Sequence, residues 1–294
     1  MFKTTENPYP TSNVNYSQPP SPGNQIRDFV GRYQVNSISK IKEQLLNMPR
    51  GSWILWDLDD TVFIPILPLL RTVNVALLEN YLETQKVQYP NIRQLLWELY
   101  DCCEYKLVEE KEILQLFLDL KEKEIHVLSL TKRRTGYATS WQLEKKLSHE
   151  DLTLSQLSKL GITFSSVFSE SEIILMESEL GDPDKKLELF SFEYQGPAKI
   201  KSGVIFTSKL EKGFIAKLVL QKATELGIPR PPAIGFVDDL KENADNAEAV
   251  FNEIGIESLI IHYTAANDLY DNCHIDTHAL NREIERLHEM KNRG

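Results

Sequence analysis

The stretch that most constrains the fold is an apolar run, 53–56, that leads directly into the acidic residues Asp57, Asp59 and Asp60. A continuous apolar run indicates a strand that is buried on both faces, as in a parallel sheet covered by helices. Open α/β sheets bind ligands at the carboxyl ends of such strands. Carboxylates crowded there repel one another, and a hard cation such as Mg²⁺ would relieve the repulsion. The alternative is a strand followed by an acidic turn, because Asp is common in turns.

A second apolar run, 233–237, also ends in paired carboxylates, Asp238 and Asp239. An isolated Asp-Asp pair is usually a turn or a helix cap. Two acidic clusters, each directly after a buried strand, are a more specific signal. They predict that both clusters meet at one edge of a sheet.

Two further strands are predicted at 125–130 and 203–207. The first ends at Thr131 and is followed by the basic residues Lys132, Arg133 and Arg134. A hydroxyl and a basic cluster after a strand suit an anionic ligand, although a solvated loop explains them equally well. The second is followed by a predicted helix that runs to about residue 226, where Gly227 and Pro229 end it.

Asp57-x-Asp59-x-Thr61 after an apolar strand resembles the first motif of the haloacid dehalogenase superfamily, whose members are mostly phosphatases and phosphotransferases. The second motif of that superfamily is a strand that ends in Ser or Thr, and Thr131 matches it best. Ser129 is the other candidate, but a residue inside the strand should face the packed interior. The motifs also resemble a poorly characterised bacterial branch of these proteins.

The third motif is a lysine near the start of a helix, often followed by Gly, and Lys212-Gly213 fits it. Two other lysines compete for this role, namely Lys209 and Lys217. Asp238 and Asp239 resemble the fourth motif, whose acidic residues complete a Mg²⁺ site.

The resemblance implies phosphoryl transfer through an aspartyl-phosphate. Asp57 would be the nucleophile, and Asp59 would protonate the leaving oxygen and later deprotonate water. Thr131 would hydrogen-bond the phosphoryl oxygens, and Lys212 would balance negative charge. The implied Mg²⁺ ligands are the Asp57 carboxylate, the Asp59 main-chain carbonyl, Asp238, and Asp239 directly or through water.

The predicted fold class is α/β, a doubly wound parallel sheet of the Rossmann-like haloacid dehalogenase type with a helical cap insert. Strands and crossover helices alternate along the chain, which independently favours a parallel sheet. We expect a disordered arm over 1–24, because this Pro-rich segment has too little apolar area to fold. The core would comprise 25–65 and 107–294, with 141–200 as an elaboration of uncertain structure, and the insert would comprise 66–106.

The formal net charge of -10 argues against general binding to nucleic acid or to an anionic membrane. No apolar run reaches about 18 residues, so no transmembrane helix is expected. No standard secretory signal is visible, so the default expectation is a cytoplasmic protein, and export by another route stays open. The cysteines, Cys102, Cys103 and Cys273, fit no zinc spacing.

The resemblance therefore implies a Mg²⁺-dependent phosphatase that hydrolyses phosphate monoesters. Asp59 favours hydrolysis, but a phosphotransferase with the same site is the first alternative. A non-catalytic interaction protein with the same fold is the second. Small phosphorylated molecules are the expected substrates, because an insert at 66–106 would hang over the strand ends as a lid.

Overall fold

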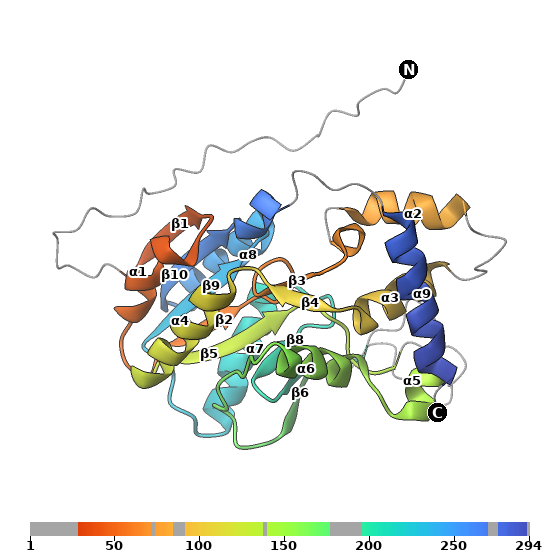
Figure 1. Cartoon of the computed structure of the whole chain (residues 1–294). Coiled ribbons are helices and arrows are strands. Elements are labelled where there is room, and N and C mark those ends of the chain that lie inside the picture. The colour runs from red at the N-terminus through yellow and green to blue at the C-terminus, as the bar shows by residue number, and fades with distance from the viewer. Residues whose placement is uncertain are drawn as a thin grey trace.

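The computed structural model describes residues 29–71, 74–84, 92–137, 140–176, 196–269 and 276–292. The described residues form an eight-stranded sheet in the order β1-β10-β9-β2-β5-β8-β7-β6 (Figure 1). Its strands are β1 (Gly31–Val35), β2 (Trp53–Trp56), β5 (His126–Thr131), β6 (Glu172–Met176), β7 (Ala198–Lys201), β8 (Val204–Phe206), β9 (Ala233–Asp238) and β10 (Glu257–Tyr263). The six strands from β1 to β8 in that order are parallel, and β7 and β6 continue the sheet in antiparallel fashion.

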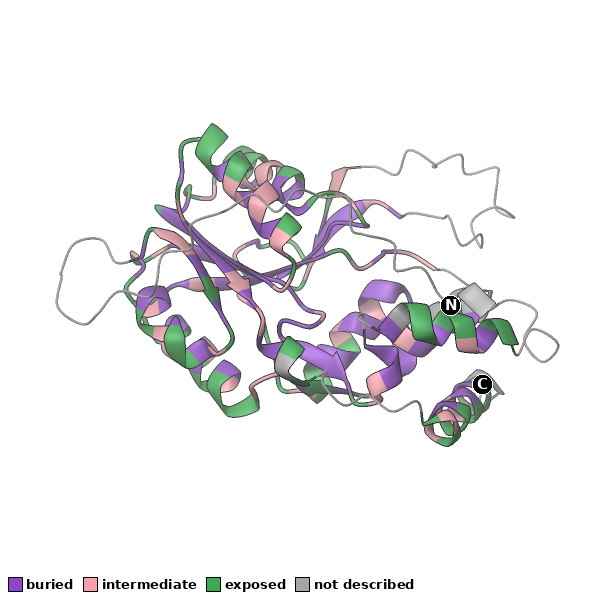
Figure 2. Cartoon of the chain, turned by 90° about the horizontal axis from the view of Figure 1, so that it is seen from above, coloured by how far each residue is buried: buried purple, intermediate pink, exposed green. Residues whose placement is uncertain are grey.

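Helices cover both faces of the sheet, so the predicted α/β class is confirmed. On one face lie α1 (Lys42–Leu46), α4 (Glu110–Glu122) and α6 (His149–Lys159). On the other face lie α7 (Lys212–Glu225) and α8 (Lys241–Glu253). Figure 2 shows the sheet buried between the helices, whose outer faces are exposed.

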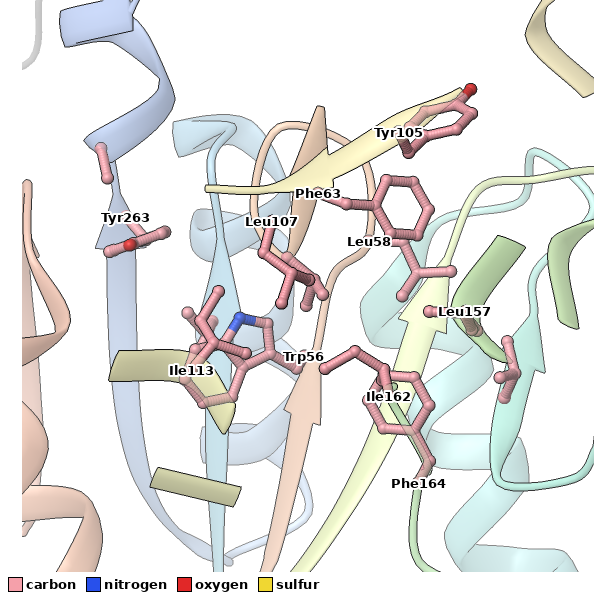
Figure 3. Packing of buried hydrophobic residues seen from close by; sticks show 14 of the residues in the cluster. Trp56, Leu58, Phe63, Tyr105, Leu107, Ile113, Leu157, Ile162, Phe164 and Tyr263 are labelled. Atoms are coloured by element: carbon pink, nitrogen blue, oxygen red, sulfur yellow. The ribbon is translucent and has the colours of Figure 1, made fainter. Parts of the chain in front are cut away.

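Strand β2 lies in the middle of the sheet and sends its side chains alternately to the two faces. Trp56 is fully buried and packs edge-to-face on Phe117 of α4, with ring centroids 5.2 Å apart. On the opposite face Trp53 packs on Phe168, with centroids 6.0 Å apart. Burying each such aromatic stabilises the fold by about 1.5–3 kcal/mol. The hydrophobic cluster around Trp56 continues into the insert through Leu58 and Phe63 (Figure 3).

The insert begins and ends at a two-stranded antiparallel ribbon that the sequence did not reveal, β3 (Phe63–Pro65) and β4 (Tyr105–Leu107). Between them lie η2 (Pro68–Leu70), α2 (Val75–Thr84) and α3 (Ile92–Cys102). The sequence pattern over 67–84 predicts one helix, whereas the structure has a 3₁₀ turn followed by a shorter α-helix. Residues 85–91, between the two helices, lie outside the described residues.

The C-terminal helix α9 (Thr277–Asn292) packs on α3, whereas the sequence grouped it with the core. In Figure 1 it lies beside α2 and α3, to the right of the sheet. Its apolar stripe, Leu280, Ile284 and Leu287, is buried in the cluster that also contains Leu95 and Leu99 of α3. In the sequence these three residues recur at helical spacing in an otherwise charged segment, which indicates a covered face but not the helix that covers it.

Parts of 141–200 add the antiparallel edge of the sheet. Before it come α5 (Ser140–Lys145) and α6, whose first turn is closed by a capping box between Ser148 and Asp151. The tight β7–β8 turn uses Gly203 at φ +77°, where an added Cβ would lie 2.7 Å from the main-chain oxygen of Ser165. The segment 187–194, whose sequence suits either a short strand or a helix, and the predicted arm at 1–24 lie outside the described residues.

The N-terminal part of the core also differs from expectation. Strand β1 was not predicted; it pairs in parallel with β10 at the edge of the sheet. The apolar spacing of Ile38, Ile41, Leu45 and Leu46 predicts one helix from about residue 36 to 48. The structure has instead a 3₁₀ turn, η1 (Ile38–Lys40), which is capped by Ser37 and followed by α1. None of the described helices is long and apolar enough to cross a membrane.

Candidate functional site

Two of the predicted carboxylates meet because their strands are neighbours in the sheet. Asp57 follows β2 and Asp238 ends β9, and Trp56 aligns with Val237 across the parallel pair. The Asp57 N–H donates to the Val237 carbonyl at 2.9 Å, which continues the ladder past the end of β2. Asp57, Asp238 and Asp239 each offer a carboxylate oxygen, and these three atoms lie within 4.8 Å of one another. The cluster could hold a metal ion.

Lys212, the first residue of α7, places its ammonium group between the two strand ends. Its Nζ donates to Asp57 Oδ1 and, at 2.6 Å, to Asp238 Oδ2. Burial alone would lower the pKa of Lys212, but Asp238 and Asp57 outweigh it and raise that pKa. The ammonium is therefore charged although its residue is only 2% exposed.

Gly213 lets α7 approach α8 closely, which fixes the position of Lys212. An added Cβ would lie 2.6 Å from Asn246 Oδ1 and 2.8 Å from the Asn246 main-chain oxygen. The Gly213 N–H donates to that Oδ1 at 2.8 Å. A side chain at position 213 would push the start of α7 away from α8.

The two carboxylates after β9 are held differently. Asp238 Oδ1 accepts the Leu240 N–H and the Asn243 side-chain amide, both at 2.9 Å. The Asp239 N–H donates to Thr61 Oγ1 at 3.1 Å, and that hydroxyl donates to Asp57 Oδ2 at 3.2 Å. Thr61 thus bridges the loop after β2 and the loop after β9. The sequence matched Thr61 to the first motif but did not predict this bridge.

The electrostatics of the cluster favour a cation. Burial raises the pKa of Asp57 to about 7; Lys212 opposes this, whereas Asp238 and Asp59 add to it. Burial also raises the pKa of Asp239 to about 9, with repulsion from Asp57 and Asp238 next in size. One lysine does not balance three carboxylates, and oxygen ligands suit hard divalent cations. The donor set therefore fits the predicted metal site.

Asp59 does not join this cluster. Both of its carboxylate oxygens accept hydrogen bonds from Arg133, at 2.7 and 2.8 Å. The sequence assigned Arg133 to a basic cluster suited to an anionic ligand, whereas the structure commits its guanidinium to Asp59.

Thr131 lies at the carboxyl end of β5, the strand beside β2, and is 1% exposed. Its Oγ1 accepts the Arg133 N–H at 3.2 Å, which leaves the hydroxyl proton able to donate. Ser129, the alternative, is completely buried inside the strand, and its Oγ has no hydrogen-bond partner among the described residues.

Of the three candidate lysines, Lys212 is the one that reaches Asp57. Lys217 lies farther along α7 and pairs on the surface with Glu253 at 2.7 Å. Lys209 is exposed in the loop after β8, where its backbone has φ +71°. Burial and then the nearby Arg134 lower the pKa of Lys209.

Residues 34–291 match the model of a family described as "Protein of unknown function (DUF2608)". The chain belongs to this family. This family is not one of the haloacid dehalogenase superfamily, so the membership of that superfamily indicated by the four motifs is wrong. The reason is that acidic residues after buried strands and a lysine at a helix start are short patterns, which α/β proteins of other families can share. No curated protein and no solved structure matches the chain.

For this DUF2608 member the site must therefore be interpreted from its own geometry. The structure brings Asp57, Asp238, Asp239 and Lys212 together and places Thr131 on the neighbouring strand. Sequence reasoning missed the bridge made by Thr61 and the pairing of Arg133. The one sequence signal for the pairing of Arg133 with Asp59 was position. Arg133 comes two residues after Thr131, which ends the strand next to the one that precedes Asp59.

Proposed function

We propose that this chain is a metal-dependent hydrolase of phosphate monoesters that works through an aspartyl-phosphate on Asp57. The observation that carries the proposal is the position of the Lys212 ammonium between Asp57 and Asp238, beside a cluster of three carboxylates. A cation next to a buried carboxylate at a strand end suits a ligand that brings its own negative charge, as a phosphoryl group does. The roles of Asp57, Lys212 and the three metal-binding carboxylates rest on this geometry, and the proposed roles of Asp59 and Thr131 are those that the motif pattern suggests.

Asp57, Asp238 and Asp239 would hold the metal ion, with the main-chain carbonyl of Asp59 as the further ligand expected from the sequence. We propose Mg²⁺, because every candidate ligand atom is a hard oxygen and the sheet edge offers no His or Cys to this cluster within the described chain. When bound, Mg²⁺ would neutralise part of the charge on the phosphoryl group.

The chain's own residues then divide the chemistry. A carboxylate oxygen of Asp57 attacks phosphorus, a P–O bond forms, and the P–O bond to the leaving alcohol breaks. Asp59 gives a proton to the leaving oxygen; it later takes one from a water molecule that attacks the phosphoenzyme. Inorganic phosphate leaves and the Asp57 carboxylate is regenerated. Lys212 stabilises the charge that gathers beside Asp57, and Thr131 donates to a phosphoryl oxygen.

Small phosphorylated molecules are the proposed substrates. The insert and α9 add a group of helices beside the sheet, and such a cover over the strand ends would exclude bulky chains from the site. Transfer to an added alcohol instead of water would indicate a phosphotransferase, and product analysis with acceptors separates the two activities.

The test is hydrolysis of an aryl phosphate with Mg²⁺ present or chelated. We expect activity that needs the metal and that Asp57→Asn abolishes, because the amide keeps the shape of the side chain but is not a nucleophile. Thermal unfolding of the same variant checks that the fold is intact. Activity that survives either treatment would reject the mechanism.

A further inference from the structure

The guanidinium group of Arg133 grips Asp59 with two parallel hydrogen bonds. Nε donates to Asp59 Oδ2 at 2.8 Å and Nη2 donates to Asp59 Oδ1 at 2.7 Å. The Asp59 side chain is 37% exposed, whereas that of Arg133 is 13% exposed. A bidentate pair fixes the plane of a carboxylate as well as its distance. The partly exposed Asp59 carboxylate is thus oriented by the mostly buried guanidinium group of Arg133.

Arg133 is itself fixed from three other directions. Its Nη1 donates to Thr153 Oγ1 at 3.1 Å and to Gln156 Oε1 at 2.5 Å, both on α6. The guanidinium carbon lies 4.8 Å from the centre of the Phe63 ring and 5.2 Å from that of Tyr105. These two rings pack edge-to-face, with centroids 4.7 Å apart, and Figure 3 shows them side by side. Such contacts leave the arginine little freedom to reorient.

The same contacts connect Arg133 to the insert. Phe63 and Tyr105 belong to β3 and β4, the ribbon at which the insert begins and ends. Gln156, which holds Arg133, also donates to the Tyr100 and Asp101 carbonyls, at 3.2 and 2.7 Å. These carbonyls lie in the last turn of α3, where a helix leaves its oxygens without intrahelical partners. Gln156 therefore links the end of α3 to the arginine that orients Asp59.

We propose that Arg133 is a positioning residue that holds the Asp59 carboxyl group in the orientation needed for proton transfer and couples that orientation to the base of the insert. The proposal rests on the proposed function, in which Asp59 protonates the leaving oxygen. For proton transfer one Asp59 oxygen must carry the proton in place of its bond from Arg133, while the guanidinium keeps its bond to the other oxygen. Arg133 acts through Asp59, and its hydrogen bonds within the described residues do not reach Asp57. Its loss should therefore affect the step that needs Asp59 more than phosphoryl transfer itself.

The test compares two substrates that differ in their need for a proton. The leaving group of a nitrophenyl phosphate departs readily without one, whereas the alkoxide of a simple alkyl phosphate does not. The quantity to measure is kcat/KM, because it reports the steps up to the first irreversible one, the departure of the alcohol. General acid catalysis contributes about 100- to 10,000-fold, so Arg133→Ala should lower kcat/KM for the alkyl phosphate by roughly 10- to 100-fold. The value for the nitrophenyl phosphate should change by less than about threefold, and Asp59→Asn should show the same split.

Three further variants guard against a general loss of structure. Arg133→Lys keeps the charge but lacks the planar fork, so we expect the same split in reduced form. Tyr105→Leu removes the ring beneath the guanidinium and should also show the split. Tyr105→Phe keeps the ring and loses the hydrogen bond from its hydroxyl to the Tyr100 carbonyl at 2.8 Å, so its split should be much smaller. Equal losses on both substrates, a gain in activity, or a split for Tyr105→Phe as large as for Tyr105→Leu would overturn the proposal.

Crystal structures of the Arg133→Lys and Tyr105→Leu proteins test the positioning directly and do not depend on turnover. We expect the Asp59 carboxylate to adopt more than one orientation while Asp57, Asp238 and Lys212 stay in place. An Asp59 carboxylate that keeps its single orientation in both variants would overturn the proposal even if the phosphatase activity is found. An unmodified protein that cleaves neither ester would instead reject the proposed function.

Discussion

Lys212 Nζ donates to Asp238 Oδ2 at 2.6 Å, and this bond joins the start of α7 to the end of β9. The same nitrogen donates to Asp57 at the end of β2. Since both carboxylates and the ammonium are buried, each charge depends on the others for stabilisation. The lysine therefore has two roles in the proposed site: it holds three segments together, and it supplies positive charge beside the nucleophile.

Replacing Lys212 tests both roles in one variant. Lys212→Met keeps most of the volume and removes the charge, and we expect kcat to fall by about 100- to 1000-fold. The free energy of unfolding should fall by about 3–5 kcal/mol in the metal-free protein, because a buried charge network loses its only described cation. Chemical denaturation and steady-state kinetics measure the two effects.

The control for that experiment is Lys217→Met on the same helix. Its ion pair with Glu253 is largely exposed, and such pairs are worth about 0–1 kcal/mol. Activity should stay within about tenfold of the unmodified protein, as expected for an exposed charge. A Lys217 variant as impaired as the Lys212 variant would contradict the assignment.

Asp239→Asn should make the metal-free protein more stable. The pKa of Asp239 is raised to about 9 in the fold, so the folded protein binds its proton more tightly than the unfolded chain does. Stability is therefore lost as pH rises from the ordinary pKa of Asp, near 4, towards 9. The variant cannot ionise there, and its melting temperature should exceed that of the unmodified protein by a few degrees at pH 8. The difference should shrink towards pH 4.

Metal binding should reverse that order. Mg²⁺ stabilises whichever form binds it, so the melting temperature of the unmodified protein should rise with Mg²⁺ concentration. Asp239→Asn lacks one of the three carboxylates of the cluster, and its response should be much smaller. An equal response of both proteins would show that Asp239 is not a ligand.

Thr61→Val tests the hydroxyl bridge between the two loops. The change removes the donor to Asp57 and leaves the Asp239 N–H without its acceptor. Burying an unsatisfied group of this kind costs about 1–3 kcal/mol. Thr61→Ser keeps the hydroxyl and should recover most of the loss in a denaturation experiment. If the serine variant is as unstable as the valine variant, the methyl group and not the bridge is what matters.

The sequence predicted the parts of the site that follow from strand ends and missed those that depend on side chains meeting across the fold. Asp57 and Asp238 were predictable because each directly follows a buried run, and parallel strands bring such ends together. The grip of Arg133 on Asp59 was not, because the two residues are 74 positions apart and the pairing depends on how α6 and the β3–β4 ribbon are placed. The edge strand β1 was missed although the apolar Tyr33 and Val35 alternate with the polar Arg32 and Gln34, because five residues beside a Pro-rich arm are too short a run to stand out.

The partner of the C-terminal helix α9 could not be predicted from the sequence for the same reason. An apolar stripe tells which face of α9 is covered but carries no information about its partner. In the structure Leu280, Ile284 and Leu287 pack with α3, and Arg286 Nη2 donates to the Cys102 carbonyl at the end of that helix. If α9 supports the insert, a cavity in this contact should loosen α3 before it affects the sheet.

Ile284→Ala creates such a cavity, because the side chain is 2% exposed. Large-to-small changes of this kind cost about 2–5 kcal/mol where the affected part unfolds as a unit. Hydrogen exchange should show faster exchange for the amides of α3 and unchanged protection for β2 and β9. The matched control is Leu118→Ala on α4, whose side chain is 57% exposed and should shift stability by less than about 0.5 kcal/mol. Unchanged protection of α3 in the Ile284 variant would mean that the insert holds its fold without α9.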